Sequence, residues 1–243
     1  MRWIYISPHL DDAALSAGGL IREQAKAGIP AEIWTMMAGI PPVEEVSPFA
    51  EALHQLWGFS SARETIASRR REDQAAASIL GARTVYFDFP DCIYRRRPDG
   101  SWLYPEDVVI PPQSEDAELP ARIAEAISMQ LLPDDLLVCQ FAVGRHADHV
   151  IVRAACELLN RPLWYLADIP YLFYQPGDLA PYLEGMSETV QPVSEAGFEA
   201  WTQSVWAYKS QLSTLFDSLE GLYAALREYW EDKKGISLWQ AGG

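Results

Sequence analysis

The chain has 243 residues, of which 49% are hydrophobic and 22% are charged, a composition typical of a folded globular protein. Its formal net charge of −15 argues against affinity for phosphate backbones or anionic lipid headgroups, so we expect neither nucleic acid nor a membrane as a partner. Its three cysteines are widely spaced, and it has neither a signal-like start nor a long apolar run, so we expect a cytoplasmic protein.

Short apolar runs alternate with helical stretches along most of the chain. In chain order, the predicted elements are strand 2–7, helix 13–28, strand 31–39, helix 47–58, helix 68–82, strand 83–89, helix 120–132, strand 135–141, helix 147–160, strand 162–167 and two C-terminal helices over 197–216 and 218–234. This order is typical of an α/β fold, in which helices cover both faces of a mostly parallel sheet. Because no repeat or linker is visible, we expect a single domain over residues 1–243.

The segment over about residues 90–120 differs from the rest of the chain. It is rich in Pro, Asp and Arg and shows little hydrophobic periodicity. Loops of this length in compact domains usually have a functional role. We therefore predict a loop or lid over a site.

Three of the four histidines fall in two loops that directly follow predicted strands. The two stretches, ISPHLDD and GRHADH, contain His9, Asp11, Asp12, His146, Asp148 and His149. Because the carboxyl ends of parallel strands meet at one edge of a sheet, we expect these side chains to lie together. The fourth histidine, His54, is expected to be an ordinary histidine of an amphipathic helix.

Two histidines and a carboxylate are the protein ligands of a catalytic zinc, which keeps one position open for water. Such a metal lowers the pKa of water from about 15.7 to about 7, and a second carboxylate can then accept the proton. Taken alone, each stretch has another interpretation: Asp11 and Asp12 can cap a helix, and HADH can be a solvated first turn. Their joint occurrence behind two strands favours a site.

The two stretches together resemble the motifs of the LmbE-like, or PIG-L, family of zinc-dependent N-acetylglucosaminyl deacetylases. The usual family motifs are A/S-H-P-D-D and G-x-H-x-D-H, to which SPHLDD and GRHADH correspond. The helix RRREDQAAASILGA also matches the pattern R-x-x-E-x-x-x-A-x-x-x-L-G, and WYLADIPY and WAYKSQ are similar to later blocks. The resemblance implies a Rossmann-like three-layer αβα sandwich and the removal of an N-acetyl group from an N-acetylglucosamine-type sugar or sugar conjugate.

The resemblance also implies a role for each residue of the two motifs. His9, Asp12 and His149 would hold Zn²⁺, although Fe²⁺ suits the same ligands. Asp11 would be the general base. His146 would stabilise the oxyanion or protonate the leaving amine, and Asp148 would orient and charge a histidine. By the same resemblance, Arg69 would contact the substrate.

Several positions depart from the family pattern. Pro8 and Leu10 alter the first motif, Ala13 stands where many members have glutamate, and Gly144 stands where some members have a tyrosine. A phenol that assists the oxyanion must therefore come from elsewhere, and Tyr171 is a candidate because it follows a predicted strand.

Two further groups of polar residues can be interpreted in more than one way: two acids near the third predicted strand, and two arginine triplets. Asp88 and Asp91 can hydrogen-bond sugar hydroxyls or simply end the strand. The triplets at 69–71 and 95–97 can clamp an anionic substrate or lie in solvent, and we favour solvent for all except Arg69.

Two rival functions remain open at this point. One is the same hydrolysis acting on a thiol-sugar conjugate or a non-sugar amide. The other is a non-catalytic, Rossmann-like sugar-nucleotide binder whose histidines are structural. All of these functions require a small-molecule partner, and a homo-oligomer is compatible with each.

Overall fold

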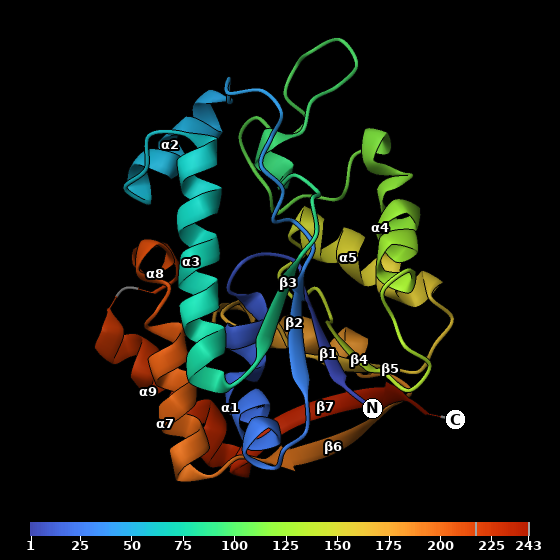
Figure 1. Ribbon diagram of the computed structural model, residues 1–243, viewed down its shortest axis with the longest axis vertical. Helices are drawn as coiled ribbons and strands as arrows, with labels where there is room; N and C mark the ends of the chain where they lie inside the picture. Colours follow the sequence, from blue (N-terminus) through green and yellow to red (C-terminus); the bar gives the residue numbers. More distant parts are fainter. Residues whose placement is uncertain (217, 243) are drawn as a thin grey trace.

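A mixed sheet forms the centre of the computed structural model, which describes residues 1–216 and 218–242. Within this part of the chain the sheet has seven strands in the order β3-β2-β1-β4-β5-β7-β6 (Figure 1). The strands are β1 (Trp3–Ser7), β2 (Ala31–Thr35), β3 (Arg83–Tyr86), β4 (Leu136–Gln140), β5 (Leu163–Leu166), β6 (Met186–Pro192) and β7 (Gly235–Ala241). The first five are parallel, whereas β7 is antiparallel to both β5 and β6. The expected mostly parallel α/β sheet is confirmed.

Alternate residues of the central strands face two different layers of helices, as the two-residue period of a strand requires. Tyr5 and Ile33 pack among one set of helices, whereas Ile4, Ile6 and Trp34 pack among the other. The first layer contains α1 (Asp12–Lys26), α3 (Ala62–Leu80), α7 (Glu195–Val205) and α9 (Leu219–Lys233), and the second contains α4 (Leu119–Ser128) and α5 (Ala147–Leu158). Figure 1 shows these layers on opposite sides of the sheet, which is the expected αβα sandwich. No helix among the described residues has the length and apolar character needed to cross a membrane.

Element boundaries differ from the predictions mainly at helix starts and strand ends. The helix predicted over 68–82 begins six residues earlier at Ala62, because Ser61 caps it by accepting a hydrogen bond from the Glu64 N–H. The strands predicted over 31–39 and 83–89 end at Thr35 and Tyr86.

The C-terminal region does not consist of two helices, so that prediction was wrong. The stretch 197–216 is divided into α7 and α8 (Lys209–Leu215) by a turn at Tyr208, whose φ and ψ of −83° and 56° are not helical. The Tyr208 side chain is buried there and donates a hydrogen bond to Asp73 of α3. The helical pattern of this stretch contains no local signal for the break, because a tertiary contact anchors the turn.

Strands β6 and β7 were also missing from the predictions. The outer strand β6 is mostly exposed and polar and pairs with β7 through seven residue positions. Backbone hydrogen bonds to β7, and not an apolar pattern, hold β6 in the sheet, which is why the sequence did not reveal this strand.

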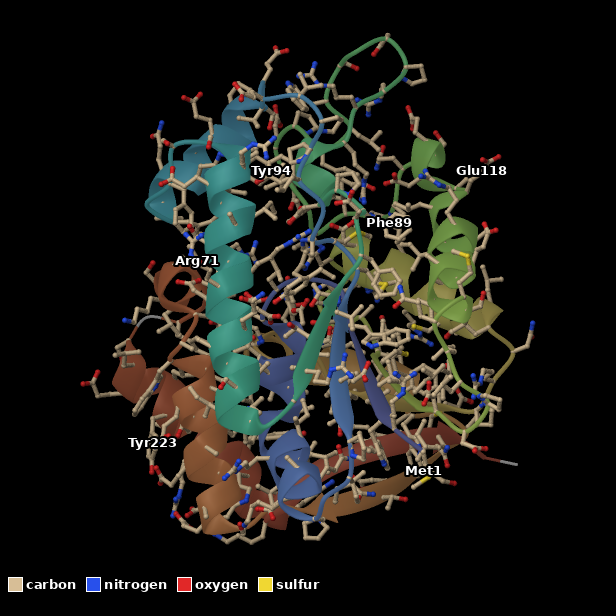
Figure 2. The ribbon with its side chains drawn as sticks, viewed as in Figure 1. Met1, Arg71, Phe89, Tyr94, Glu118 and Tyr223 are labelled. Carbon is tan, nitrogen blue, oxygen red and sulfur yellow. The ribbon has the colours of Figure 1, made fainter. Side chains whose placement is uncertain are left out.

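The segment predicted as a loop or lid is packed against the top of the domain. It contains two single-turn helices, η1 (Cys92–Tyr94) and η2 (Ser114–Asp116). Ile93, Leu103 and Tyr104 are buried in a third apolar cluster shared with α2 (Pro48–Leu56) and the start of α3. In Figure 2, Tyr94 marks this cluster at the end of the molecule away from Met1. The segment therefore forms a cover near the carboxyl ends of the strands.

Candidate metal centre and active site

The loop after β1 is held in shape by its own hydrogen bonds. The Ser7 hydroxyl donates to the His9 carbonyl oxygen at 2.7 Å and accepts from the Ala13 N–H at 3.1 Å. The His9 N–H donates to Asp12 Oδ2 at 2.7 Å. These bonds fix His9, Asp11 and Asp12 at the carboxyl edge of the sheet, all with less than 9% of their surface exposed.

The loop after β4 brings the second motif to the same place. Ala142, Gly144 and Arg145 all have positive φ, so the chain turns tightly before His146 at the start of α5. The ring centroids of the three site histidines are 4.8 Å apart for His9 and His146, 5.3 Å for His9 and His149, and 5.2 Å for His146 and His149. The predicted convergence of the two motifs is confirmed.

Asp12 lies between two imidazoles at a spacing that suits a metal ion. Its Oδ2 atom is 3.4 Å from His9 Nδ1 and 3.4 Å from His149 Nε2. Two donors bound tetrahedrally to zinc at about 2.1 Å lie about 3.4 Å apart. Asp12 therefore lies at ligand spacing from each of the two histidines.

Each of these two histidines also contacts a second carboxylate through its other ring nitrogen. His9 Nε2 lies 3.1 Å from Asp148 Oδ2, and His149 Nδ1 lies 2.8 Å from Asp168 Oδ1. Both carboxylates are completely buried. An N–H donated outward leaves the lone pair of the other nitrogen free for a metal, an arrangement typical of metal-binding histidines. Asp148, for which the resemblance implied contact with a histidine, therefore contacts His9.

His146 has a different environment from the other two. Its Nδ1 accepts a hydrogen bond from the Asp148 N–H at 3.2 Å, so a neutral ring carries its proton on Nε2. Burial has the largest effect on the pKa of His146 and holds it well below its usual range. The neighbouring imidazoles of His9 and His149 lower this pKa further. A nitrogen of His146 also lies within 4.8 Å of donor atoms of His9 and His149, which makes it a geometric alternative to Asp12 as a ligand. Because Nδ1 is occupied as an acceptor, the N–H at Nε2 is the donor that a neutral His146 ring offers.

The adjacent carboxylates Asp11 and Asp12 have opposite electrostatic environments. Burial raises the pKa of Asp11, only partly offset by Arg69, whose Nη2 lies 3.4 Å from Asp11 Oδ2. Burial also acts to raise the pKa of Asp12, but His149 and His9 outweigh it and lower that pKa. Two neighbouring acids whose pKa values diverge are typical of a division between a proton acceptor and a permanently charged group.

A cavity of about 190 Å³ opens above these groups. Its polar floor and apolar walls are lined by His9, Asp11, Asp12, Leu15, Phe49, Leu53, Trp57, Arg69, Asp91, Ile93, Val108, His146, His149, Pro170, Tyr171, Gln211 and Leu215. The apolar wall comes from α2, the 90–120 segment and α8, so the break between α7 and α8 directs Gln211 and Leu215 toward the site.

Tyr171 occupies the space beside Gly144. A Cβ atom at position 144 would lie only 2.3 Å from Tyr171 Cδ1, and φ there is +81°. The Tyr171 ring also packs edge-on against His149 at 5.4 Å. The glycine and the tyrosine therefore fit together, and a phenol borders the cavity although position 144 has no side chain.

The structure separates the polar residues that the sequence left ambiguous. Asp91 and Arg69 line the cavity, whereas the Asp88 side chain is 90% exposed and is not part of the lining. Arg71 is exposed on the outer side of α3 (Figure 2). Arg95 is buried, contrary to the expectation for its triplet, because Asp148 Oδ1 and Asp116 Oδ2 lie 2.6 Å and 3.1 Å from its Nη2.

Sequence reasoning missed Asp168, Arg95, Trp57 and Gln211. Asp168 carried a usable signal, since it is an acid placed directly behind an apolar strand, as Asp11 and Asp12 are. Trp57 stacks under the Arg69 guanidinium at 5.1 Å, a contact that no local pattern predicts. His54 lies outside the cavity lining and bonds the Tyr94 hydroxyl at 2.7 Å.

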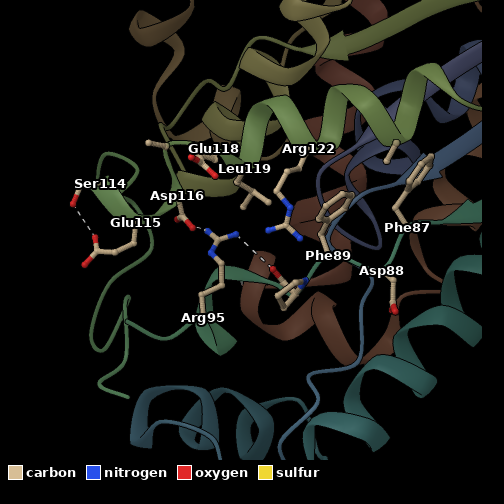
Figure 3. A pocket seen from close by; sticks show the side chains of 13 residues that line it. Phe87, Asp88, Phe89, Arg95, Ser114, Glu115, Asp116, Glu118, Leu119 and Arg122 are labelled. Atoms are coloured by element: carbon tan, nitrogen blue, oxygen red, sulfur yellow. Dashed lines mark hydrogen bonds and ion pairs between the residues drawn. The ribbon is translucent and has the colours of Figure 1, made fainter. Parts of the chain in front are cut away.

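A larger hollow of about 590 Å³ lies between α4 and the segment after β3 (Figure 3). Arg122 and Phe89 lie side by side there, with a guanidinium-to-ring distance of 5.9 Å, and Arg95 points toward Asp116. Arg95 lines this hollow but not the histidine cavity. The three site histidines line only the smaller of these two cavities.

Replacing Asp168 with asparagine is expected to weaken metal binding about 10- to 100-fold, the usual effect of losing a carboxylate behind a ligating histidine. The carboxylate of Asp168 accepts from both His149 and the Val143 N–H, and an amide cannot accept at both positions. Competition with a chelator measures the change. Asp135→Asn is the matched control, because Asp135 is equally buried but pairs with Arg2 at the opposite edge of the sheet. Equal losses in both variants would contradict a specific role for Asp168.

Comparisons with known proteins show a family and several relatives to which the chain is similar. A family model described as "PIG-L: GlcNAc-PI de-N-acetylase" matches residues 4–159. A 2'-N-acetylparomamine deacetylase of Niallia circulans is 29% identical over 235 residues, covering 88% of this chain and 82% of that relative. The zinc-inhibited form of the teicoplanin deacetylase Orf2 superposes with a TM-score of 0.86 at 30% identity, over 99% of this chain and 97% of that one. The A40926 pseudoaglycone deacetylase Dbv21 gives a TM-score of 0.75 at 29% identity, over 98% and 96% of the two chains.

Proposed function

Since the chain belongs to the PIG-L family of de-N-acetylases, we propose that it hydrolyses the N-acetyl group of an N-acetylglucosamine-type sugar with Zn²⁺ as its metal. One observation supports this above all others. Asp12 Oδ2 lies at ligand spacing from both His9 and His149, and the Asp11 carboxylate, which pairs with Arg69, borders the same cavity. That arrangement supplies a metal site and a separate proton acceptor within one cavity.

His9, Asp12 and His149 would hold the metal, which when bound polarises the amide carbonyl and makes water more acidic. Asp148 and Asp168 hold the two imidazoles in the orientation needed for this role. Zinc is the metal to test first because imidazole and carboxylate ligands in tetrahedral spacing suit it.

Asp11 is the proposed general base. Its carboxylate borders the cavity, and its raised pKa favours uptake of a proton from the attacking water. Arg69 keeps the side chain in place through its 3.4 Å contact and its stacking on Trp57.

His146 is the proposed donor to the tetrahedral oxyanion or to the departing amine. Its neutral ring carries a proton on Nε2, because Nδ1 accepts from the Asp148 N–H. Tyr171 borders the same space and can stabilise the oxyanion in place of the absent tyrosine at position 144. Asp91 and Arg69 are the proposed contacts for sugar hydroxyls.

The substrate class follows from the relatives and from the shape of the cavity. The similar proteins are described as deacetylases of 2'-N-acetylparomamine, of teicoplanin and of the A40926 pseudoaglycone. The apolar wall around a polar floor suits a sugar whose attached group is partly apolar. We also propose a reducing, cytoplasmic location, which the three free, buried cysteines support.

The direct test is amine release by the zinc-loaded protein from a panel of substrates. The panel contains N-acetylglucosamine, 2'-N-acetylparomamine, an N-acetylglucosaminyl glycopeptide, an N-acetylated thiol-sugar conjugate and a simple acetamide. Turnover of the sugar amides that disappears with a chelator and returns with Zn²⁺ is the expected result. Turnover of the thiol-sugar or simple amide alone would favour the rival amidase, and no turnover at all would refute the proposal.

Replacing Leu53 with aspartate should raise KM about tenfold for substrates with an apolar attached group, with little change in kcat. Leu53 lines the cavity, and burying a leucine side chain contributes about 1.5–3 kcal/mol, of which 1.4 kcal/mol is a factor of ten. Leu56→Asp is the matched control, because Leu56 is on the same helix but is 59% exposed and does not line the cavity. An unchanged KM in Leu53→Asp would exclude this wall from substrate binding.

A further inference from the structure

Helix α8 forms part of the wall of the catalytic cavity, yet little within the helix itself holds it there. It has only seven residues, Lys209–Leu215, and helices this short are not stable alone in water. Its N-cap residue Tyr208 makes no side-chain capping bond, and the residue of α8 that is buried is the polar Gln211. Leu212 and Leu215 are only partly buried. The position of α8 therefore depends on contacts with other elements.

Two consecutive acids of α3 hold the start of α8, which lies beside α3 in Figure 1. Ser210 donates to Glu72 twice, from its N–H to Oε1 at 2.9 Å and from its hydroxyl to Oε2 at 2.6 Å. Asp73 accepts the Tyr208 hydroxyl at 2.8 Å, one position before α8 begins. Glu72 is thus the residue of this pair that binds the helix itself.

The bonds to Glu72 also fix the orientation of the Gln211 side chain. A carboxylate only accepts hydrogen bonds, so the Ser210 hydroxyl gives its proton to Glu72. The same hydroxyl can then only accept from Gln211, whose Nε2 lies 2.9 Å away. Among the described residues no group donates to Gln211 Oε1, so this oxygen remains available to a donor group of a ligand in the cavity that Gln211 lines.

We propose that Glu72 is a positioning residue for the substrate, because its bonds to Ser210 hold Gln211 and Leu215 against the cavity. The inference rests on the proposed function, since it concerns how the acetylated sugar is bound. Gln211 offers an acceptor for a hydroxyl or N–H group, and Leu215 offers an apolar surface for the attached group. Glu72 does not line the cavity and therefore acts through α8. The one further bond at the end of α8, from the exposed Tyr174 hydroxyl to the Leu215 carbonyl oxygen, lies at the surface.

The position of α8 should affect substrate binding and leave the chemical step unchanged. The proposed metal ligands and the proposed base belong to the loop after β1 and to α5. Within the described part of the chain, none of their hydrogen bonds or ion pairs involves α8. A contact made equally with the substrate and with the transition state changes KM and leaves kcat as it was.

Replacing Glu72 with alanine should raise KM for the acetylated sugar about tenfold, with kcat changed less than about twofold and zinc content unchanged. Glu64→Ala is the matched control, because Glu64 is on the same helix and accepts from the Ser60 N–H at 2.9 Å and the Ser60 hydroxyl at 2.6 Å. It thus loses the same pair of bonds, but to a residue just before α3, and should keep the KM of the wild type. Steady-state kinetics and elemental analysis provide the readouts.

Hydrogen exchange tests the anchoring of α8 without any substrate. The backbone amides of α8 should exchange at least about tenfold faster in Glu72→Ala than in the wild type or in Glu64→Ala. Thermal unfolding establishes that each variant is folded. If Glu72→Ala is not, Ser210→Ala takes its place, because it removes the hydroxyl that links Glu72 to Gln211.

Three results would overturn the inference: a wild-type KM in the folded variant, a loss confined to kcat, or an equal rise of KM in Glu64→Ala. Unchanged exchange of the α8 amides would also overturn it, because Glu72 would then not hold the helix. If the wild type turns over no acetylated sugar, the function proposal fails, whereas the exchange rates still decide whether Glu72 anchors α8.

Discussion

Replacing His149 with alanine is expected to abolish stoichiometric zinc binding and to lower kcat/KM about a thousandfold or more. The substitution removes the ligand whose Nε2 lies 3.4 Å from Asp12 Oδ2, and metal activation contributes several kcal/mol to the reaction, of which each 1.36 kcal/mol is a factor of ten in rate. Elemental analysis of protein equilibrated with one equivalent of Zn²⁺ measures the first effect, and amine release measures the second.

A loss of stability must be separated from a loss of ligand in this experiment. Without His149, the Asp168 carboxylate is left completely buried, with only the Val143 N–H as a partner, which costs on the order of 3 kcal/mol. The double variant His149→Ala with Asp168→Asn removes that unpaired charge and should recover stability without recovering zinc. His54→Ala is the control for removal of a histidine, because His54 is buried on α2 outside the cavity lining. Full zinc content in His149→Ala would exclude it as a ligand.

Replacing Asp11 with asparagine should lower kcat about 10²- to 10⁴-fold while zinc content stays at that of the wild type. Loss of a general base has an effect of this size, and the amide has no basic oxygen to receive the proton of water. Zinc content should persist because the proposed ligand atoms belong to Asp12, His9 and His149. Steady-state kinetics and elemental analysis of the same sample provide both readouts.

Asp88→Asn is the control for this substitution, because the Asp88 side chain is 90% exposed and does not line the cavity. It should have the activity of the wild type. If Asp11→Asn is fully active, another group accepts the proton; if it loses zinc, Asp11 is a ligand rather than a base. The raised pKa of Asp11 and the lowered pKa of Asp12 argue against both outcomes.

Arg95 shows how a single residue can connect the cover of the active site to its metal ligands. Its guanidinium contacts Asp148, which in turn contacts His9 Nε2. It also contacts Asp116 of η2, so this one residue of the 90–120 segment is paired both within the segment and with Asp148 beside His9. Here the packing of the cover and the geometry of the metal site depend on the same side chain.

The sequence by itself determined the α/β fold and the two polar motifs of the site. Short apolar strands and periodic helices depend on local spacing, and acids and histidines directly behind buried strands must meet at one edge of a parallel sheet. That is why the sequence alone places His9 and His149, 140 positions apart, at one edge of the sheet.

Tertiary structure alone decided the groups that complete the site. Asp168 joins His149, Tyr171 fills the space at Gly144, and Arg95 pairs with Asp148 through contacts between distant segments. The turn at Tyr208 likewise depends on a buried hydrogen bond to Asp73, and β6 depends on pairing with β7. Such features arise from partners that a local pattern does not contain, because their stabilisation comes from the packing of elements far apart in the chain.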